Sequence, residues 1–225
     1  MLVLVDQDQT LADFGDGFDR RFLAAHPDAP LAPRAEATSY WIEDSYPAEW
    51  HQRIREVVTW PGFFRDLAVL PGAREAMEQM LDDGHDVRIC TAPVRSYRHC
   101  VREKYEWVEE HLGLHWTERM IVTRDKTLVT GDVLIDDKPE VVGALGTPTW
   151  THAYYGTAYN RHLPGRHLDW STWREVLAQV EAERAARGTL LVPRLVDART
   201  PASTHRRAPA PATTRISVTA PQPVA

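Results

Sequence analysis

Two pairs of acidic residues each follow a short apolar run. Asp6 and Asp8 come directly after Leu-Val-Leu-Val, and Asp136 and Asp137 come directly after Val-Leu-Ile. Paired carboxylates suit a hard, oxygen-seeking cation such as Mg²⁺. They also suit chemistry in which one carboxylate attacks phosphorus while another handles protons. Taken alone, the first pair fits a polar turn equally well, and the second resembles an ordinary loop cap.

A hydroxyl and a lysine stand between these pairs in the chain. Thr91 follows Val-Arg-Ile-Cys, where its hydroxyl and the nearby amides could hold phosphate oxygens. Lys126 lies in Thr-Arg-Asp-Lys-Thr and could neutralise a phosphoryl group. Each alone would more often be a turn former or a solvated surface residue. Their order favours a shared site, because a parallel sheet gathers the ends of successive strands at one edge.

The elements that must position these residues form an alternating pattern. Short apolar runs bounded by polar turns alternate with segments of helical periodicity, which predicts an α/β fold with a parallel sheet flanked by helices. The predicted strands are Leu2–Val5, Val87–Cys90, Met120–Thr123, Val133–Ile135 and Thr147–Thr151. Helices are predicted over Pro71–Leu81, through Val101 to Leu112, and from Ser171 to about Gly188.

The segment 14–64 is too long for a simple crossover and is rich in aromatic residues, so it predicts a small, mostly helical cap inserted after the first strand. An enzyme-sized domain would then span residues 1–188, with its core in 1–13 and 65–188. Residues 189–198 form an ambiguous linker. Residues 199–225 are rich in Pro, Ala and Thr and are expected to be a disordered tail.

Charge and cysteine content exclude some classes of protein. The formal net charge of the chain is −6, which argues against binding of long nucleic acids. The tail has four arginines and no acidic residue, so the rest of the chain is more acidic still. Two cysteines, Cys90 and Cys100, indicate neither a disulfide framework nor a zinc site. The first residues lack a basic segment and a long apolar run, so no membrane association is expected and the expected location is the cytoplasm.

The ordered set of acid pair, hydroxyl, lysine and acid pair resembles the haloacid dehalogenase superfamily, whose phosphatases carry Asp-x-Asp-x-Thr/Val, Ser/Thr, Lys and paired acids. The resemblance implies a Rossmann-like sheet and a Mg²⁺ cofactor. It makes Asp6 the nucleophile and Asp8 the general acid/base. Thr91 and Lys126 would bind phosphate. The implied metal ligands are Asp6, the main-chain carbonyl of Asp8, and Asp136 with Asp137 in support.

A closer resemblance is to the 5′(3′)-deoxyribonucleotidases, and it covers roughly residues 2–180. In that family, aromatic residues line the nucleoside pocket. The resemblance transfers this role to Phe14, Tyr40, Trp41 and, less directly, Phe64. The stretches that carry it are DQDQTLADF (6–14), PGFFRDLAVLPG (61–72), EKYEWVE (103–109), TRDKT (123–127) and LIDDKP (134–139).

Three residues depart from the family pattern. Gln7 and Gln9 stand where family members usually have Met and Gly, and Ala92 replaces a Ser that follows the motif threonine. Neither glutamine removes a catalytic group. The missing serine hydroxyl removes one hydrogen bond near the phosphate or the sugar.

These observations lead to one hypothesis with two alternatives. The leading hypothesis is a Mg²⁺-dependent phosphomonoesterase that acts on small deoxyribo- and ribonucleoside monophosphates through an aspartyl-phosphate. The first alternative is a phosphatase for another small ester, such as a sugar phosphate. The second is a catalytically silent binding protein that recruits a partner through its basic tail. Base and sugar preference, the choice of 5′ or 3′ phosphate and the number of subunits stay open, with a homodimer among the options.

Overall fold

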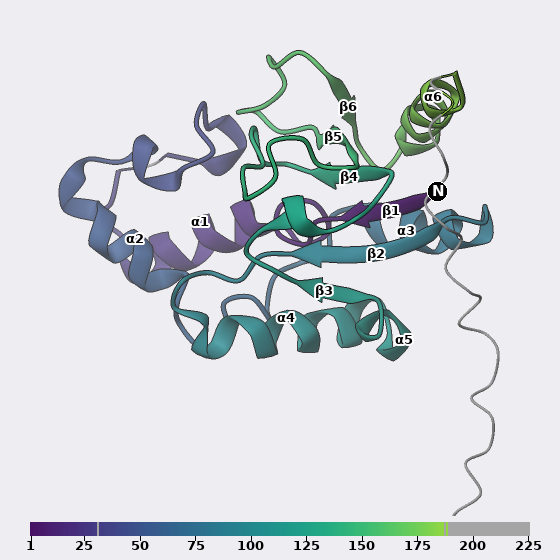
Figure 1. The fold of residues 1–225 in the computed structure, drawn as a ribbon. Coiled ribbons are helices and arrows are strands. Elements are labelled where there is room, and N and C mark those ends of the chain that lie inside the picture. Colours follow the sequence, from purple (N-terminus) through teal and green to yellow (C-terminus); the bar gives the residue numbers. More distant parts are fainter. Residues whose placement is uncertain (31, 187, 189–225) are drawn as a thin grey trace, which may run out of the picture. The chain divides into compact units, whose positions relative to one another are not determined.

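The computed structural model describes residues 1–30, 32–186 and 188 (Figure 1). Its centre is a six-stranded sheet in the order β3-β2-β1-β4-β5-β6, in which every neighbouring pair is parallel. This confirms the predicted parallel α/β architecture. The strands are β1 (Leu2–Val5), β2 (Asp86–Thr91), β3 (Met120–Val122), β4 (Val133–Asp136), β5 (Thr151–Tyr155) and β6 (Arg166–Leu168).

The central strands are apolar along their whole length because both faces of the sheet are covered. Val3 and Val5 join a large core cluster, while Leu4, between them, joins a smaller cluster with Cys90 and Leu134 on the other face. This alternation follows from the two-residue period of a strand. A parallel strand buried on both faces has no polar side, which explains the run Leu-Val-Leu-Val.

The main helices begin and end where the sequence provides a signal. The Asp13 side chain accepts the amide of Asp16 at 3.0 Å and caps the first helix, and Gly113, with φ 110°, follows the end of the fourth. The three predicted helices are present as α3, α4 and α6, with ends that differ from the predicted ones by a few residues. The helices are α1 (Phe14–Ala25), α2 (His51–Val57), α3 (Ala73–Asp82), α4 (Tyr97–His111), α5 (Leu114–Thr117) and α6 (Trp173–Ala186).

The predicted fifth strand, Thr147–Thr151, was wrong in position. β5 begins at Thr151 and continues to Tyr155. Residues before it are held by side chains instead of a strand ladder: the Thr149 hydroxyl accepts the Gly131 amide at 3.0 Å, and the Trp150 indole donates to the Lys126 carbonyl at 3.2 Å. Short β6 and one-turn α5 were not predicted, since neither has enough residues to show a period.

The cap segment, residues 14–64, contains α1, α2 and three short 3₁₀ helices, η1 (Arg34–Glu36), η2 (Ile42–Ser45) and η3 (Ala48–Trp50). Figure 1 shows the arrows of β1 and β2 pointing toward it. Its own packing is aromatic: Phe22 stacks on Phe18 at 5.1 Å between ring centroids and meets Tyr46 edge-on at 5.2 Å. Most cap aromatics therefore serve its core, and the limits 14–64 remain a proposal.

Two further sequence expectations concern the ends of the chain and the membrane. The predicted linker 189–198 and tail 199–225 lie outside the described residues. Among the described residues, no helix is both long enough and apolar enough to cross a bilayer.

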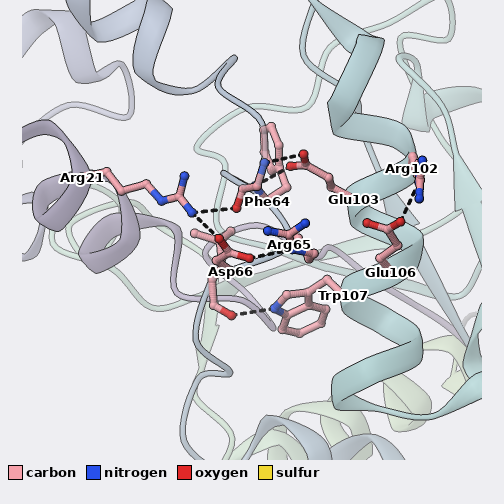
Figure 2. A network of polar contacts seen from close by, with 10 residues as sticks. Arg21, Phe64, Arg65, Asp66, Arg102, Glu103, Glu106 and Trp107 are labelled. Carbon is pink, nitrogen blue, oxygen red and sulfur yellow. Dashed lines mark hydrogen bonds and ion pairs between the residues drawn. The ribbon is translucent and has the colours of Figure 1, made fainter. Parts of the chain in front are cut away.

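A buried carboxylate fixes the segment that returns the chain from the cap to the sheet. Glu103 of α4 accepts hydrogen bonds from the amides of Gly62 and Phe64, the latter at 3.1 Å (Figure 2). Arg21 of α1 donates to the Gly62 carbonyl at 2.8 Å, and the Trp107 indole donates to the Leu67 carbonyl at 2.8 Å. Two helices therefore hold this return segment through its backbone.

Removing the Glu103 carboxylate should destabilise the protein. Glu103→Ala leaves two buried amides without an acceptor, so the free energy of unfolding measured in urea should fall by roughly 2–5 kcal/mol. Glu106→Ala on the same helix removes only an exposed pair with Arg102 and should cost about 0.5 kcal/mol or less. Equal losses in the two variants would contradict this role for Glu103.

Candidate active site

The predicted acids meet where the order of the sheet reverses. From β1 the chain builds outward through β2 and β3 and then returns to β4 on the other side of β1. Ligands of open α/β sheets bind at such a switch point, beyond the carboxyl ends of the strands. The Asp6 amide donates to the Ile135 carbonyl at 2.8 Å, which holds the ends of β1 and β4 in register. Asp6, Asp136 and Asp137 are all buried here, with carboxylate oxygens within 4.8 Å of one another.

Lys126 is the counter-charge of this acid cluster. Its ammonium lies 2.7 Å from Asp6 Oδ1 and 2.6 Å from Asp136 Oδ2. Burial alone would lower the pKa of Lys126, but Asp136 and Asp6 together raise it, so it stays charged. Burial raises the pKa of Asp6, and Lys126 opposes that rise. The lysine predicted as a phosphate ligand is thus buried among these acids, although a lysine in such a stretch would more often be a solvated surface residue.

The acid cluster fits a divalent cation. Burial raises the pKa of Asp137, and the charges of Asp136 and Asp6 raise it further. Three crowded carboxylates with one lysine leave uncompensated negative charge, which is costly in a buried site. The donor atoms are all oxygen, the set that hard cations prefer.

Asp8 belongs to a second, separate contact set. Its carboxylate is not part of the three-acid cluster and lies 2.7 Å from the ammonium of Lys104, which is completely buried in α4. Lys104 also donates to the Thr91 hydroxyl at 3.0 Å. Its ammonium sits 5.0 Å from the centre of the Phe64 ring. One lysine thus joins the expected proton donor, the expected phosphate-binding hydroxyl and an aromatic ring.

Sequence reasoning missed Lys104, although it lies inside the stretch EKYEWVE. A usable signal was present. Cys100, Lys104 and Trp107 are spaced by four and three residues on the buried face of α4, so the lysine interrupts an apolar stripe. A charged residue at such a position needs a buried partner.

The two glutamines that depart from the family pattern are accommodated by local hydrogen bonds. Gln9 has φ 56°, a left-handed conformation that favours glycine. Its side-chain oxygen accepts the Gly15 amide at 2.7 Å, which supplies a partner at the start of α1. Buried Gln7 donates to the Lys104 carbonyl at 3.2 Å. Neither displaces a predicted catalytic group.

A cleft of about 600 Å³ opens over these acids and reaches the cap segment. Phe14, Tyr40 and Trp41, the residues predicted to contact a nucleoside, lie on its wall, and Trp41 is 60% exposed. Phe64 and Thr91 are not among the residues of this wall: both are buried, and both contact Lys104. The wall also includes Asp6, Asp8, Arg34, Val94, Arg124 and Tyr159.

Comparison with known proteins gives this geometry a family. Residues 1–185 match the family described as 5′ nucleotidase, deoxy (pyrimidine), cytosolic type C protein. The chain belongs to the 5′(3′)-deoxyribonucleotidase family. The human cytosolic-type 5′(3′)-deoxyribonucleotidase is 45% identical over 185 residues, covering 78% of this chain and 92% of that protein. A Bordetella pertussis protein, provisionally named a 5′(3′)-deoxyribonucleotidase, is 48% identical over 179 residues, covering 79% and 96%.

Solved structures place this family member in the haloacid dehalogenase fold. A haloacid dehalogenase-like hydrolase from Xanthomonas campestris superposes with a TM-score of 0.50 at 17% identity, covering 83% of this chain and 94% of that one. A HAD-hydrolase of Bacillus subtilis, solved with magnesium, also gives 0.50 at 13% identity, covering 78% and 97%. At these identities the likeness establishes the fold alone.

Lys104 should affect activity through Asp8. Lys104→Met removes the charge and keeps an apolar stem in the buried site, so kcat should fall by at least about tenfold for any phosphate ester. Rates are measured with p-nitrophenyl phosphate in the wild type, Lys104→Met, Asp8→Asn and the double variant. If the lysine acts through Asp8, Lys104→Met should cost little more in the Asp8→Asn background. Independent, multiplying losses would show that it does not.

Proposed function

We propose that this chain is a phosphomonoesterase that removes phosphate from deoxyribo- and ribonucleoside monophosphates through an aspartyl-phosphate on Asp6. The observation that carries the proposal is the cleft. At its floor lie a buried carboxylate paired with a lysine and a second carboxylate paired separately, and aromatic rings line its wall. The names of the human and Bordetella relatives support the same substrate class.

In the first half of the reaction, the Asp6 carboxylate attacks phosphorus and the bond from phosphorus to the nucleoside oxygen breaks. Asp8 gives that oxygen a proton as it leaves. Burial raises the pKa of Asp8, although Lys104 opposes the rise, and this favours a carboxyl that carries a proton. Within the described residues Asp8 Oδ1 is buried and has no hydrogen-bond partner, and the proposal gives it one in the leaving oxygen of the substrate.

In the second half, water attacks the phosphorus of the aspartyl-phosphate. Asp8, now ionised, takes a proton from that water, and the bond between phosphorus and the Asp6 oxygen breaks. Inorganic phosphate leaves and the Asp6 carboxylate is restored. Because Asp8 gives a proton in one half and takes one in the other, its contact with Lys104 positions it for both steps.

The proposed cofactor is Mg²⁺, held by Asp6, Asp136, Asp137 and the main-chain carbonyl of Asp8. When bound, the cation offsets the repulsion between the Asp6 carboxylate and a dianionic phosphate. Lys126 adds a fixed positive charge beside Asp6 and Asp136. The Thr91 hydroxyl is proposed as a further phosphate ligand.

The proposed nucleoside pocket is the aromatic wall formed by Phe14, Tyr40 and Trp41. A nucleobase has a flat face that can stack on such rings, whereas a sugar phosphate has none. The Tyr40 and Trp41 rings meet at 81° with their centres 5.2 Å apart, so they present surfaces in two orientations. The proposed location is the cytoplasm, which accords with the cytosolic-type name of the human relative.

Asp6→Asn should remove turnover without unfolding the protein. Loss of the nucleophile from a reaction this slow in water should lower kcat by at least about 10⁴-fold. Phosphate release is measured with Mg²⁺ for a panel of deoxyribonucleotides, ribonucleotides and sugar phosphates. The assay is repeated with a chelator, and removal of the metal should abolish the activity of the wild type. Exposed Asp28, outside the cleft wall, gives the control Asp28→Asn. A wild type that prefers sugar phosphates would overturn the nucleotide assignment, and activity in Asp6→Asn would overturn the mechanism.

Trp41→Ala should affect nucleotides selectively. Stacking of a base on an aromatic ring is worth about 1–3 kcal/mol, so kcat/KM for nucleotides should fall about 5- to 150-fold. p-Nitrophenyl phosphate has no nucleoside and should be affected much less. Trp60→Ala is the matched control, since Trp60 lies in the cap segment but not on the cleft wall. A Trp41→Ala variant that slows both substrates equally, or neither, would remove Trp41 from the nucleoside pocket.

A further inference from the structure

Tyr159 lies between the acid cluster and the aromatic wall and contacts both. It is 5% exposed, and its hydroxyl donates a hydrogen bond to Asp137 Oδ2. Its ring meets Tyr40 edge-on, at 80° and 5.9 Å between centroids.

The loop that carries Tyr159 is fixed by the next residue. Completely buried Asn160 donates from Nδ2 to the main-chain carbonyls of Asp137 and Tyr155, both at 2.8 Å. Its Oδ1 accepts the Thr157 amide at 2.8 Å. The position of Tyr159 relative to Asp137 is therefore determined by the backbone as well as by the hydroxyl.

On its other side, the Tyr159 ring is covered by a buried arginine of the cap segment. The Arg34 guanidinium lies 5.4 Å from the ring centre. It also donates to the main-chain carbonyls of Ser39 and Tyr40, at 3.3 and 3.0 Å. Arg34 thus ties the backbone that carries the Tyr40 ring to the face of Tyr159.

We propose that Tyr159 is a positioning residue with two separable roles: its hydroxyl orients the Asp137 carboxylate in the metal site, and its ring, covered by Arg34, holds Tyr40 in the nucleoside wall. The second role rests on the proposed nucleotide substrate. The first requires only the acid cluster. One side chain thereby makes the metal site and the substrate wall parts of the same packed unit.

The two roles predict different losses. The hydroxyl occupies one oxygen of Asp137 and restricts rotation of the carboxylate. Loss of such an outer partner typically weakens metal binding about 10- to 100-fold. The edge contact with Tyr40 has the strength of an aromatic pair, so loss of the ring should reduce nucleotide efficiency by about 2- to 10-fold beyond the metal effect.

Tyr159→Phe tests the hydroxyl. The half-saturating Mg²⁺ concentration is measured for turnover of p-nitrophenyl phosphate and, without substrate, for the rise in melting temperature that Mg²⁺ produces. Both should increase by about tenfold or more, and saturating Mg²⁺ should largely restore the rate. Tyr154→Phe is the matched control, because its hydroxyl donates to the Pro139 carbonyl at 3.2 Å and touches no acid of the cluster. A Tyr159→Phe value within twofold of wild type, or an equal shift in Tyr154→Phe, overturns the first role.

Tyr159→Leu tests the ring at saturating Mg²⁺. The ratio of kcat/KM for a deoxyribonucleotide to that for p-nitrophenyl phosphate should fall in Tyr159→Leu and stay at the wild-type value in Tyr159→Phe. A ratio unchanged in Tyr159→Leu, or lowered equally in Tyr159→Phe, overturns the second role. If the wild type itself shows no preference for nucleotides, the proposed substrate fails, while the Mg²⁺ measurements still decide the first role.

Discussion

Burial of negative charge at the end of the sheet is the constraint that the rest of this site has to satisfy. Asp6, Asp136 and Asp137 share one small volume, and an unpaired carboxylate in such a place would be strongly destabilising. Two buried lysines compensate part of this negative charge, and they come from different parts of the chain. Lys126 lies in the 3₁₀ helix after β3, and Lys104 lies in α4. The pairs Lys126–Asp6 and Lys104–Asp8 each join the end of β1 to an element far along the chain. These two pairs therefore depend on the packing of β1 against those distant elements.

The sequence alone was sufficient to predict those parts of the fold that depend on a local pattern of residues. Central strands buried on both faces must be continuously apolar, so β1 and β4 and the acids that follow them could be located from residue types alone. The crossover helices α3 and α4 were equally evident from their period. The start of β5 could not be predicted in this way. Thr149 and Trp150 precede the strand and form hydrogen bonds with residues that are distant in the chain.

Other parts of the site could not be derived from local pattern because they consist of long-range contacts. Arg34 and Tyr159 are separated by more than half of the described chain, and neither lies in one of the sequence motifs that indicated the site. Phe64 is a different case, because it was predicted at the site but lies elsewhere. It was expected at the nucleoside pocket from its place in a similar stretch, but its ring lies beside Lys104 and it is not among the residues of the cleft wall. Resemblance identifies which residues gather at a site more reliably than it identifies which of them reach the ligand.

Helix α4 shows how two adjacent residues can serve different parts of the structure. Successive residues of a helix project about 100° apart, so Glu103 and Lys104 reach in different directions from the same turn. Glu103 holds the backbone that returns from the cap, while Lys104 holds Asp8 and Thr91 (Figure 2 shows the Glu103 side of this arrangement). Phe64 contacts both residues, since its amide donates a hydrogen bond to Glu103 and its ring lies against the Lys104 ammonium. A shift of the return segment would therefore disturb the lysine that positions Asp8. Helix α4 therefore links the placement of the cap segment to the placement of Asp8.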